Sequence, residues 1–281
     1  MRMKFKKVLS ISILFLFMIV ECASSSTSQS DHNITMRFLI ASDGHEYRGN
    51  NWSIYYNNLI SYANNEYITN GLNYSFTNGD MIDGNDTLAS GTAAMVNLRD
   101  NYFNRLLMPY HYNIGNHELN KGAVNNQSFY NVWGYGSDST IVDGNFVFVF
   151  LNITGRNDFN CSNPQYLENT LDANPTKKCF VIIHASQVQS TGAGNSVVNA
   201  TFNNIINSHA NVMAVISGHD HWTNICLKNY TNCYQCWDGA LNSDVTTLGS
   251  GCRMFECYDD GQILTYEYDL TNNEVKNMNV I

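Results

Sequence analysis

Positive charge is scarce in this sequence of 281 residues. Lys and Arg together number 15 against 24 Asp and Glu, which gives a formal net charge of −9. Proteins that hold nucleic acid through its phosphates carry a broad basic surface, and this chain has too few cations to form one. A phosphate-bearing substrate would therefore have to be attracted locally, for example by bound cations.

The apolar run at the N-terminus is too short to be a bilayer span. It covers residues 8–20 and follows the cations Arg2, Lys4, Lys6 and Lys7. A basic segment, a short apolar segment and a small residue at Cys22 are typical of a secretory signal peptide. We therefore predict export to the extracellular space or the endolysosomal lumen, with a signal peptide at 1–22, a flexible lead-in at 23–35 and one domain at 36–281.

A second Cys-x-x-Cys pair, which a zinc knuckle would need beside Cys233 and Cys236, is missing. Seven of the eight cysteines lie beyond residue 22, and five of these crowd between Cys226 and Cys257. Such crowding is typical of a disulfide-stapled segment in an oxidising compartment, so we predict disulfides in this Cys-rich segment, 226–257, with one thiol left over. Asn-x-Ser/Thr sequons permit a glycoprotein, at Asn33, Asn51, Asn73, Asn85, Asn126, Asn152, Asn160, Asn199 and Asn229.

Internal repeats and coiled-coil heptads are also absent, and β-prone runs instead alternate with segments of helical periodicity. Buried strands are predicted at 36–41, 74–77, 110–114, 146–151, 179–183 and 212–216. Helices are predicted at 52–67, 87–107, 164–171 and 196–209. The alternation indicates an α/β protein, and the late runs at 245–248, 253–258 and 263–268 predict a second, more antiparallel sheet.

Clusters of Asp, Asn and His follow five of the predicted strands. They are Asp43-x-His45, Gly79-Asp80-x-x-Asp83, Gly115-Asn116-His117-Glu118, His184 and Gly218-His219-x-His221. Five of the eight histidines thus lie just beyond a β-prone run, whereas His32, His111 and His209 do not and are expected to be surface or core residues. Because functional groups of α/β sheets gather at the carboxyl ends of the strands, the clusters predict one metal site.

In this order the five blocks resemble those of calcineurin-like metallophosphoesterases, and they span residues 43–221. The resemblance implies that family's fold, a two-sheet β-sandwich flanked by helices in four αββα layers. It also implies two divalent metal ions, for which mixed imidazole and oxygen ligands suit Zn, Mn or Fe. The implied activity is hydrolysis of a phosphomonoester or phosphodiester by a metal-bound hydroxide.

The resemblance further assigns a role to each block. Asp80 would bridge the two metals. The remaining ligands would be Asp43, His45 and His221 for one metal, and Asn116, His184 and His219 for the other. His117 would face the substrate as general acid or phosphate donor. Asp83 either orients the His117 imidazole or is a plain turn carboxylate, Glu118 either supports the site or is a surface charge, and Asp220 has no assignment.

Comparison with two subgroups of this family narrows the resemblance further. Asp83 stands where purple acid phosphatases carry a tyrosine ligand, and His45 is a histidine that they lack, which argues against that subgroup. Acid sphingomyelinase-like phosphodiesterases share the predicted compartment, but His184-Ala185-Ser186 is not their usual block. An alternative of another class is a non-catalytic secreted binding protein on the same fold, although no predicted ligand is missing.

The substrate is not defined by these motifs. A nucleotide, a sugar phosphate or a lipid head group would each satisfy the predicted chemistry. Tyr230, Tyr234 and Trp237 follow the last motif and could form an apolar wall beside the metals. Packing around disulfides is the more common role for aromatic residues in such a segment.

Overall fold

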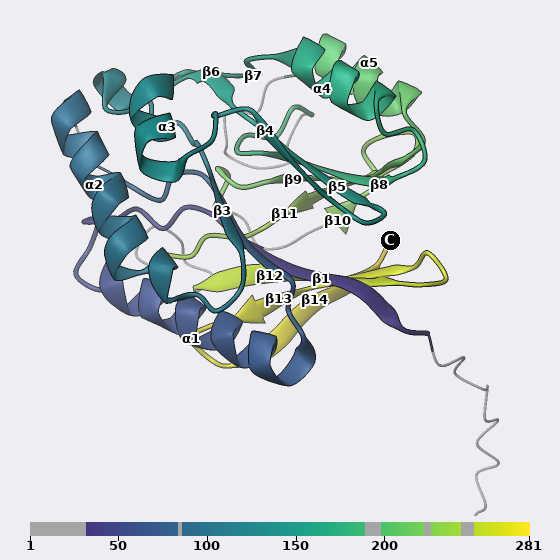
Figure 1. Ribbon diagram of the computed structural model, residues 1–281, viewed down its shortest axis with the longest axis horizontal. Helices are drawn as coiled ribbons and strands as arrows, with labels where there is room; N and C mark the ends of the chain where they lie inside the picture. Colours follow the sequence, from purple (N-terminus) through teal and green to yellow (C-terminus); the bar gives the residue numbers. More distant parts are fainter. Residues whose placement is uncertain (1–31, 84–85, 189–197, 222–225, 243–249) are drawn as a thin grey trace, which may run out of the picture. The chain divides into compact units, whose positions relative to one another are not determined.

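Two six-stranded sheets face each other in the computed structural model, which describes residues 32–83, 86–188, 198–221, 226–242 and 250–281 (Figure 1). Residues His32–Ile281 form one compact unit. The predicted signal peptide lies outside the described residues. No described helix is both long and apolar enough to span a bilayer.

The first sheet has the strand order β14-β13-β12-β1-β2-β3. Its members are β1 (Ile34–Ala41), β2 (Tyr74–Asn78), β3 (Tyr110–Asn113), β12 (Gly251–Tyr258), β13 (Ile263–Asp269) and β14 (Glu274–Val280). Strands β1, β2 and β3 run parallel, whereas β12, β13 and β14 are antiparallel to their neighbours. The predicted late runs at 253–258 and 263–268 are β12 and β13, which extend the first sheet and do not form a separate antiparallel sheet as the sequence had suggested. The predicted run at 245–248 lies outside the described residues.

The second sheet has the strand order β10-β11-β9-β8-β5-β4. Its members are β4 (Ser139–Asp143), β5 (Phe146–Leu151), β8 (Lys178–Ile183), β9 (Val212–Ser217), β10 (Cys226–Leu227) and β11 (Tyr234–Trp237). The pairs β5–β8, β8–β9 and β9–β11 are parallel. A separate hairpin joins β6 (Ile153–Gly155) to β7 (Asp158–Cys161).

Helices cover the outer face of each sheet, which confirms the predicted four-layer αββα architecture (Figure 1). Helices α1 (Trp52–Asn70), α2 (Leu88–Asn101) and α3 (Asn126–Trp133) pack on the first sheet. Helices α4 (Pro164–Asp172) and α5 (Ala200–Ser208) pack on the second. The sequence predicted all of these except α3, which has only eight residues.

The alternation of side chains in β5 shows how the layers separate. Its six residues, Phe-Val-Phe-Val-Phe-Leu, are all buried. Successive strand residues point to opposite faces, so Phe148 and Phe150 enter the core between the sheets while Val147 and Val149 pack against the helices. The core between the sheets is aromatic, with the rings of Phe38 and Phe255 stacked at 4.7 Å.

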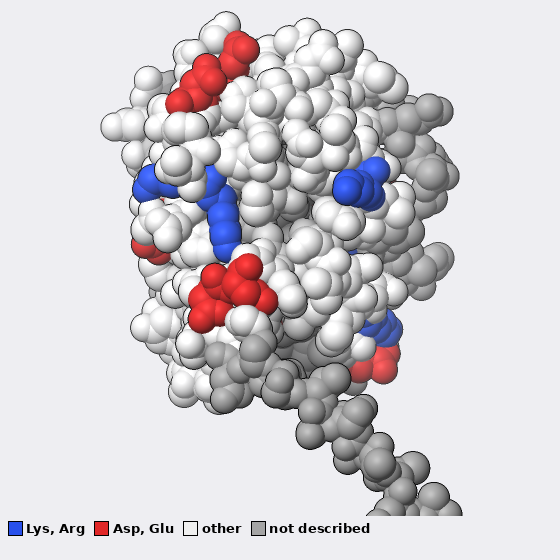
Figure 2. Space-filling view, turned by 90° about the vertical axis from the view of Figure 1, so that its right-hand side faces the viewer, with Lys and Arg blue, Asp and Glu red and all other residues white. Residues whose placement is uncertain are grey.

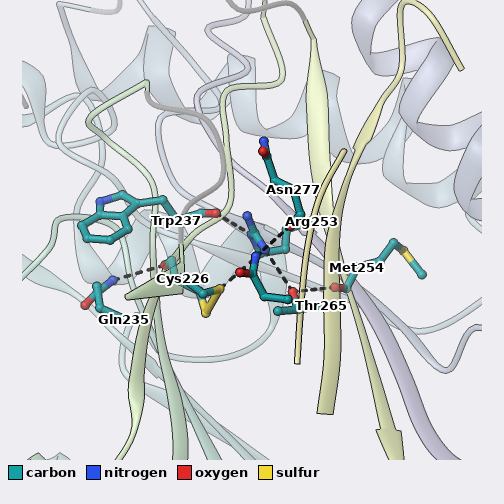
Figure 3. Close-up of a disulfide and its surroundings, with 9 residues drawn as sticks. Cys226, Gln235, Trp237, Arg253, Met254, Thr265 and Asn277 are labelled. Atoms are coloured by element: carbon teal, nitrogen blue, oxygen red, sulfur yellow. Dashed lines mark hydrogen bonds between the residues drawn. A yellow bond between two sulfur atoms is a disulfide. The ribbon is translucent and has the colours of Figure 1, made fainter. Parts of the chain in front are cut away.

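Only one disulfide occurs among the described cysteines. Cys226 and Cys236 are bonded across the paired strands β10 and β11 (Figure 3). The other described cysteines are buried free thiols, namely Cys161, Cys179, Cys233, Cys252 and Cys257. The prediction of a disulfide-stapled segment is therefore right for one bond and wrong for the rest of it, because Cys252 and Cys257 are core side chains of β12.

The surface agrees with the scarcity of basic residues. On the face shown in Figure 2, Lys and Arg side chains form small separate groups, some of them next to groups of Asp and Glu. This face offers no broad basic area of the kind that binds nucleic acid.

Candidate metal centre

The predicted site residues converge where the carboxyl ends of five parallel strands meet. Asp43 and His45 follow β1, Asp80 and Asp83 follow β2, and Asn116 and His117 follow β3 in the first sheet. From the second sheet, His184 follows β8, and His219 and His221 follow β9. The centre therefore draws its side chains from both sheets.

The backbone at this centre is in an unusual conformation. Of the nine described non-glycine residues with positive φ, five are predicted ligands: Asp43, His45, Asp80, His219 and His221. Left-handed backbone costs free energy in such residues and concentrates at functional sites. The turns that carry these residues also pack closely, because a Cβ on Gly79 would lie 2.5 Å from Cα of Gly115 and a Cβ on Gly218 would lie 2.2 Å from Oγ of Ser42.

The first group of potential metal ligands is Asp43, His45 and His221, whose ligand atoms all lie within 4.8 Å of one another. Nε2 of His221 is 3.2 Å from Oδ1 of Asp43 and 3.2 Å from Nε2 of His45. Oδ1 of Asp43 is buried and has no hydrogen-bond partner among the described residues. An unsatisfied carboxylate oxygen facing two imidazoles fits a divalent cation.

The second group is Asp80, His184 and His219. Nδ1 of His184 lies 2.6 Å from the carbonyl oxygen of Asn78, so Nδ1 carries the proton and donates it. Nε2 then faces Oδ2 of Asp80 at 3.2 Å. A histidine held in this way through Nδ1 directs Nε2 at the centre, as a metal ligand requires.

Asn116 adjoins this second group, and its amide can be placed in two ways. With the oxygen toward the centre, Oδ1 lies 3.1 Å from Nε2 of His184, as a metal ligand would. Turned over, the nitrogen donates to His184, His219 and Asp80, and the oxygen accepts from Nη1 of Arg156 at 2.6 Å. The first placement suits a site that holds a cation, and the second suits the protein atoms alone.

The electrostatics of the centre favour a cation. Burial lowers the pKa of His45 to about 4 and that of His219 to about 4, so both imidazoles are neutral at pH 7. Burial also disfavours a charged His184, but the carboxylates of Asp80 and Asp43 outweigh it and raise the pKa of His184 to about 10, so its imidazole carries a proton at pH 7 that a cation bound at Nε2 would displace. Neutral imidazoles beside carboxylates fit Zn, Mn or Fe.

The two carboxylates stay ionised in spite of their burial. Burial alone would raise the pKa of Asp43, but His221 and His184 hold it well below its usual range. For Asp80 the opposing groups are His184, His117 and His45, and its pKa is again lowered. Both oxygens of each side chain are therefore available as acceptors or ligands.

His117 lies beside the centre and pairs with Asp83. Its Nδ1 is 2.6 Å from Oδ1 of Asp83, and its backbone N–H donates to Oδ1 of Asp80 at 2.6 Å. The second oxygen of Asp83 lies 3.5 Å from Nη1 of Arg48. Asp83 was expected either to orient the His117 imidazole or to be a plain turn carboxylate. The short distance to Nδ1 favours the first of these roles.

Glu118 is a buried support for the centre. Its carboxylate accepts hydrogen bonds from the backbone N–H groups of Asp80, Met81, Ile82 and Gly115 and from the Tyr112 hydroxyl, at 2.6–3.2 Å. It is fully buried, and burial raises its pKa. These bonds fix the turn that carries Asp80, so the surface-charge reading of Glu118 is wrong.

Other residues at the centre were not found from the sequence. Ser42, Asn78 and Asp238 lie directly behind Asp43 and His184, and Arg156 reaches Asn116 from the β6–β7 turn. Ser42 and Asn78 adjoin the recognised blocks and could have been suspected from that position. Asp238 and Arg156 lie in no motif and gave no signal.

The aromatic residues after the last motif are packing residues. Tyr230 and Trp237 are buried, and Tyr230 belongs to the core between the second sheet and its helices. The indole Nε1 of Trp237 donates to Oδ2 of Asp220 at 3.0 Å, which gives Asp220 a structural partner. Of the histidines expected to be surface or core residues, His111 is a core residue stacked on Tyr135.

Comparison with known proteins agrees with this centre. Residues 36–223 match the family model described as calcineurin-like phosphoesterase. A search of curated proteins finds no match. Among solved structures, a dimetal phosphatase from Danio rerio is similar with a TM-score of 0.71 and 12% sequence identity, over 89% of this chain and 99% of that one.

Two further structures share the fold. Purple acid phosphatase PPD1 from yellow lupin has a TM-score of 0.64 and 12% identity, over 88% of this chain and 53% of that chain. GAP50, described as the anchor in the inner membrane complex of Plasmodium, has a TM-score of 0.60 and 15% identity, over 88% of each. Identities this low establish a common fold alone. The family match covers more than half of the chain, which therefore belongs to the calcineurin-like phosphoesterase family and is a phosphoesterase.

Proposed function

We propose that the protein is an exported dimetal hydrolase of small phosphate esters. The observation that carries this proposal is the convergence of all seven predicted ligands into two adjoining groups. Bound divalent cations would polarise the phosphoryl oxygens and lower the pKa of a coordinated water. Asp80 is the residue that would contact both cations, since its carboxylate lies 3.2 Å from Nε2 of His184 in the second group and also interacts electrostatically with His45 of the first.

His117 is proposed to handle the proton of the leaving group. Asp83 fixes the imidazole through Nδ1, which directs Nε2 toward the centre, 3.8 Å from Oδ2 of Asp80. The carboxylate of Asp83 accepts the proton of Nδ1, and a proton on Nε2 would then point to the departing oxygen and could be delivered to it. The side chain of His117 is 14% exposed and remains accessible to a substrate.

Arg156 is proposed to bind the phosphoryl group. When Oδ1 of Asn116 faces a cation, the amide nitrogen lies 2.6 Å from Nη1 of Arg156, and two donors then face one another. Two N–H donors at this distance repel one another, so the guanidinium would have to turn away from Asn116 and bind another acceptor. A phosphoryl oxygen is a suitable acceptor, because the planar guanidinium can donate two hydrogen bonds to a phosphoryl group.

A polar cavity of about 760 Å³ is the proposed place for the leaving group. Leu119, two residues after His117, and Thr154, two residues before Arg156, both line it. The other lining residues are mostly neutral and polar, including Asn125, Asn152, Ser162 and Asn163. This lining favours a sugar phosphate or a nucleotide over a lipid head group.

The proposal is tested with the purified chain without residues 1–22. It should hydrolyse an aryl phosphate mono- or diester with Mn²⁺ or Zn²⁺ and lose this activity in EDTA. Asp80→Asn and His117→Ala should each lower kcat by at least about 100-fold. His209→Ala, which removes a histidine at the end of α5 that is paired with Asp172 and belongs to none of these motifs, is the control.

Other outcomes would identify the alternatives. Two bound metal equivalents without turnover of any phosphoester would indicate a non-catalytic binding protein. Preference for a choline phosphodiester over a sugar phosphate would indicate the sphingomyelinase-like activity. Export is tested separately by N-terminal sequencing of protein from the culture medium of expressing cells, where a mature chain beginning at Ala23 is expected.

A further inference from the structure

A buried carboxyl group with no place in the proposed reaction lies behind the first group of ligands. Asp238 directly follows β11 and is fully buried. One of its oxygens is 2.6 Å from Oγ of Ser42, and the other accepts from Nδ2 of Asn78 at 3.0 Å. No Lys or Arg side chain forms an ion pair with it within the described ranges.

The hydroxyl of Ser42 connects Asp238 to Asp43. It lies within hydrogen-bond distance of three oxygens: Oδ2 of Asp43, Oδ1 of Asp238 and the carbonyl of Gly239. A hydroxyl has one proton to donate and can also accept. The single proton of Ser42 cannot serve three acceptor oxygens. Buried oxygens would therefore lack a hydrogen bond unless one of the three groups carries a proton and donates it to Oγ of Ser42.

Only Asp238 can supply that proton. A carbonyl has none, and Asp43 must be ionised to bind a metal. Asp238 therefore donates to Ser42, and Ser42 donates to Oδ2 of Asp43. As a neutral acid, Asp238 also avoids burying a second negative charge next to Asp43.

This chain of hydrogen bonds determines where Asp43 points. Oδ2 is held by Ser42 and by the backbone N–H of His219, the latter at 3.0 Å. Oδ1 is then directed at His45 and His221, where the first metal would bind. Without the hold on Oδ2 the carboxylate could rotate about its Cβ–Cγ bond.

The segment that carries Asp238 is itself fixed on both sides. Its backbone N–H donates to the carbonyl of Ser217 at 2.9 Å, at the end of β9. The preceding carbonyl, that of Trp237, accepts from Nε of Arg253 at 2.7 Å (Figure 3). Arg253 is fully buried and belongs to β12 of the other sheet, so Asp238 is held at the junction of the two sheets.

We propose that Asp238 is a positioning residue which, as a neutral acid acting through Ser42, orients Asp43 toward the first metal. This inference rests on the proposed dimetal function. Groups that orient a metal ligand typically change metal affinity by about 10–100-fold when they are removed. The effect should fall on one of the two metals, because Asp43 belongs to one group of ligands only.

The test is a measurement of metal affinity by chelator competition, with Mn²⁺ and Zn²⁺, on the whole chain without residues 1–22. Ser42→Ala and Asp238→Ala should weaken one metal equivalent by about 10–100-fold and leave the other within about threefold. Asp238→Asn should retain affinity within about threefold, because its amide can donate to Ser42 and accept from Asn78. Asp172→Asn, an exposed carboxylate, is the control.

Each other outcome overturns the inference. If Asp238→Asn weakens binding as much as Asp238→Ala does, the residue acts as a charged group. If Ser42→Ala and Asp238→Ala both bind two equivalents like the unaltered chain, no positioning role exists. If Asp238→Ala does not fold, Ser42→Ala and Asp238→Asn still decide the question, and an unaltered chain that binds no metal refutes the proposed function itself.

Discussion

Glu118 shows how a residue that contacts neither a predicted metal nor a substrate can determine a site. The bridging candidate Asp80 has a left-handed backbone, with φ of 53°, which is unfavourable for a residue with a side chain. The four N–H groups held by Glu118 compensate for this cost. The geometry of Asp80 is thus imposed by a neighbour.

Glu118→Gln should destabilise the protein. The glutamine amide places donors against backbone N–H groups, so at least one buried polar group loses its partner. We expect the free energy of unfolding, measured by urea denaturation, to fall by about 2–3 kcal/mol. Glu274→Gln, at an exposed position of β14, should change it by less than about 0.5 kcal/mol. Equal effects of the two changes would show that Glu118 has no special role.

Arg156→Met should lower the efficiency with which substrate is bound and hydrolysed. Loss of a charge-assisted hydrogen bond to the phosphoryl group should lower kcat/KM by about 10–100-fold and raise the inhibition constant of inorganic phosphate. Arg156→Lys should recover part of this loss, because it restores the charge without the planar guanidinium. Arg105→Met, at an exposed position, is the matched control. An unchanged inhibition constant for phosphate in Arg156→Met would contradict the assignment.

At the scale of elements, the sequence predicted those with a strong apolar pattern. The strand Phe146–Leu151 and the helix Pro164–Asp172 lie where they were expected. Strand β14 was missed because most of its residues are exposed and show no apolar alternation. Strand β11 was missed because it has four residues and lies inside the cysteine-rich stretch, where disulfides were expected to dominate.

The cysteines of these elements give a prediction for chemical modification. Burial raises the pKa of Cys161, Cys233 and Cys257 to about 12 and that of Cys179 to about 11, and it raises the pKa of Cys252 as well. Buried protonated thiols react slowly. Ellman's reagent should therefore modify none of the five within minutes in native buffer, and all five in denaturant.

Reduction of the denatured chain should then expose two more thiols, from Cys226 and Cys236. If Cys22 is retained, it adds one further reactive thiol. A native chain in which Cys252 or Cys257 reacts at once, or from which reduction releases more than two thiols, would show a different pairing of cysteines.

At the scale of the whole molecule, the two sheets bring negatively charged side chains together. The carboxylates of Asp43 and Asp80 repel one another, since the charge of Asp80 disfavours the charged form of Asp43. A bound cation would remove this repulsion, and it would bind to the folded chain but not to the unfolded chain. The dimetal centre should therefore contribute directly to stability.

Removal of metal should lower the melting temperature. A cation at 100 times its dissociation constant stabilises the folded state by about 2.7 kcal/mol per site. For a domain of this size that corresponds to about 5–10 °C per site, measurable by calorimetry with and without EDTA. Asp80→Asn should lose most of this shift. A melting temperature that does not respond to Mn²⁺, Zn²⁺ or EDTA would contradict a metal centre.

The predicted ligands could be found from the sequence because each belongs to a short block at the end of an apolar strand. A strand and the turn after it are local features, and parallel strands bring their carboxyl ends to one edge whatever their order. The alternation of strands and helices indicated an α/β protein, and the resemblance of these blocks to the family implied the αββα fold.

Only the tertiary structure decided the residues that support those ligands. Ser42 and Asp238 are 196 positions apart in the chain. They meet because β11, which precedes Asp238, pairs with β9, and because Ala240, two residues after Asp238, pairs with Ser42. The same holds for Arg156 beside Asn116. Strand order and the packing of one sheet on another depend on long-range contacts, which no local pattern in the chain encodes.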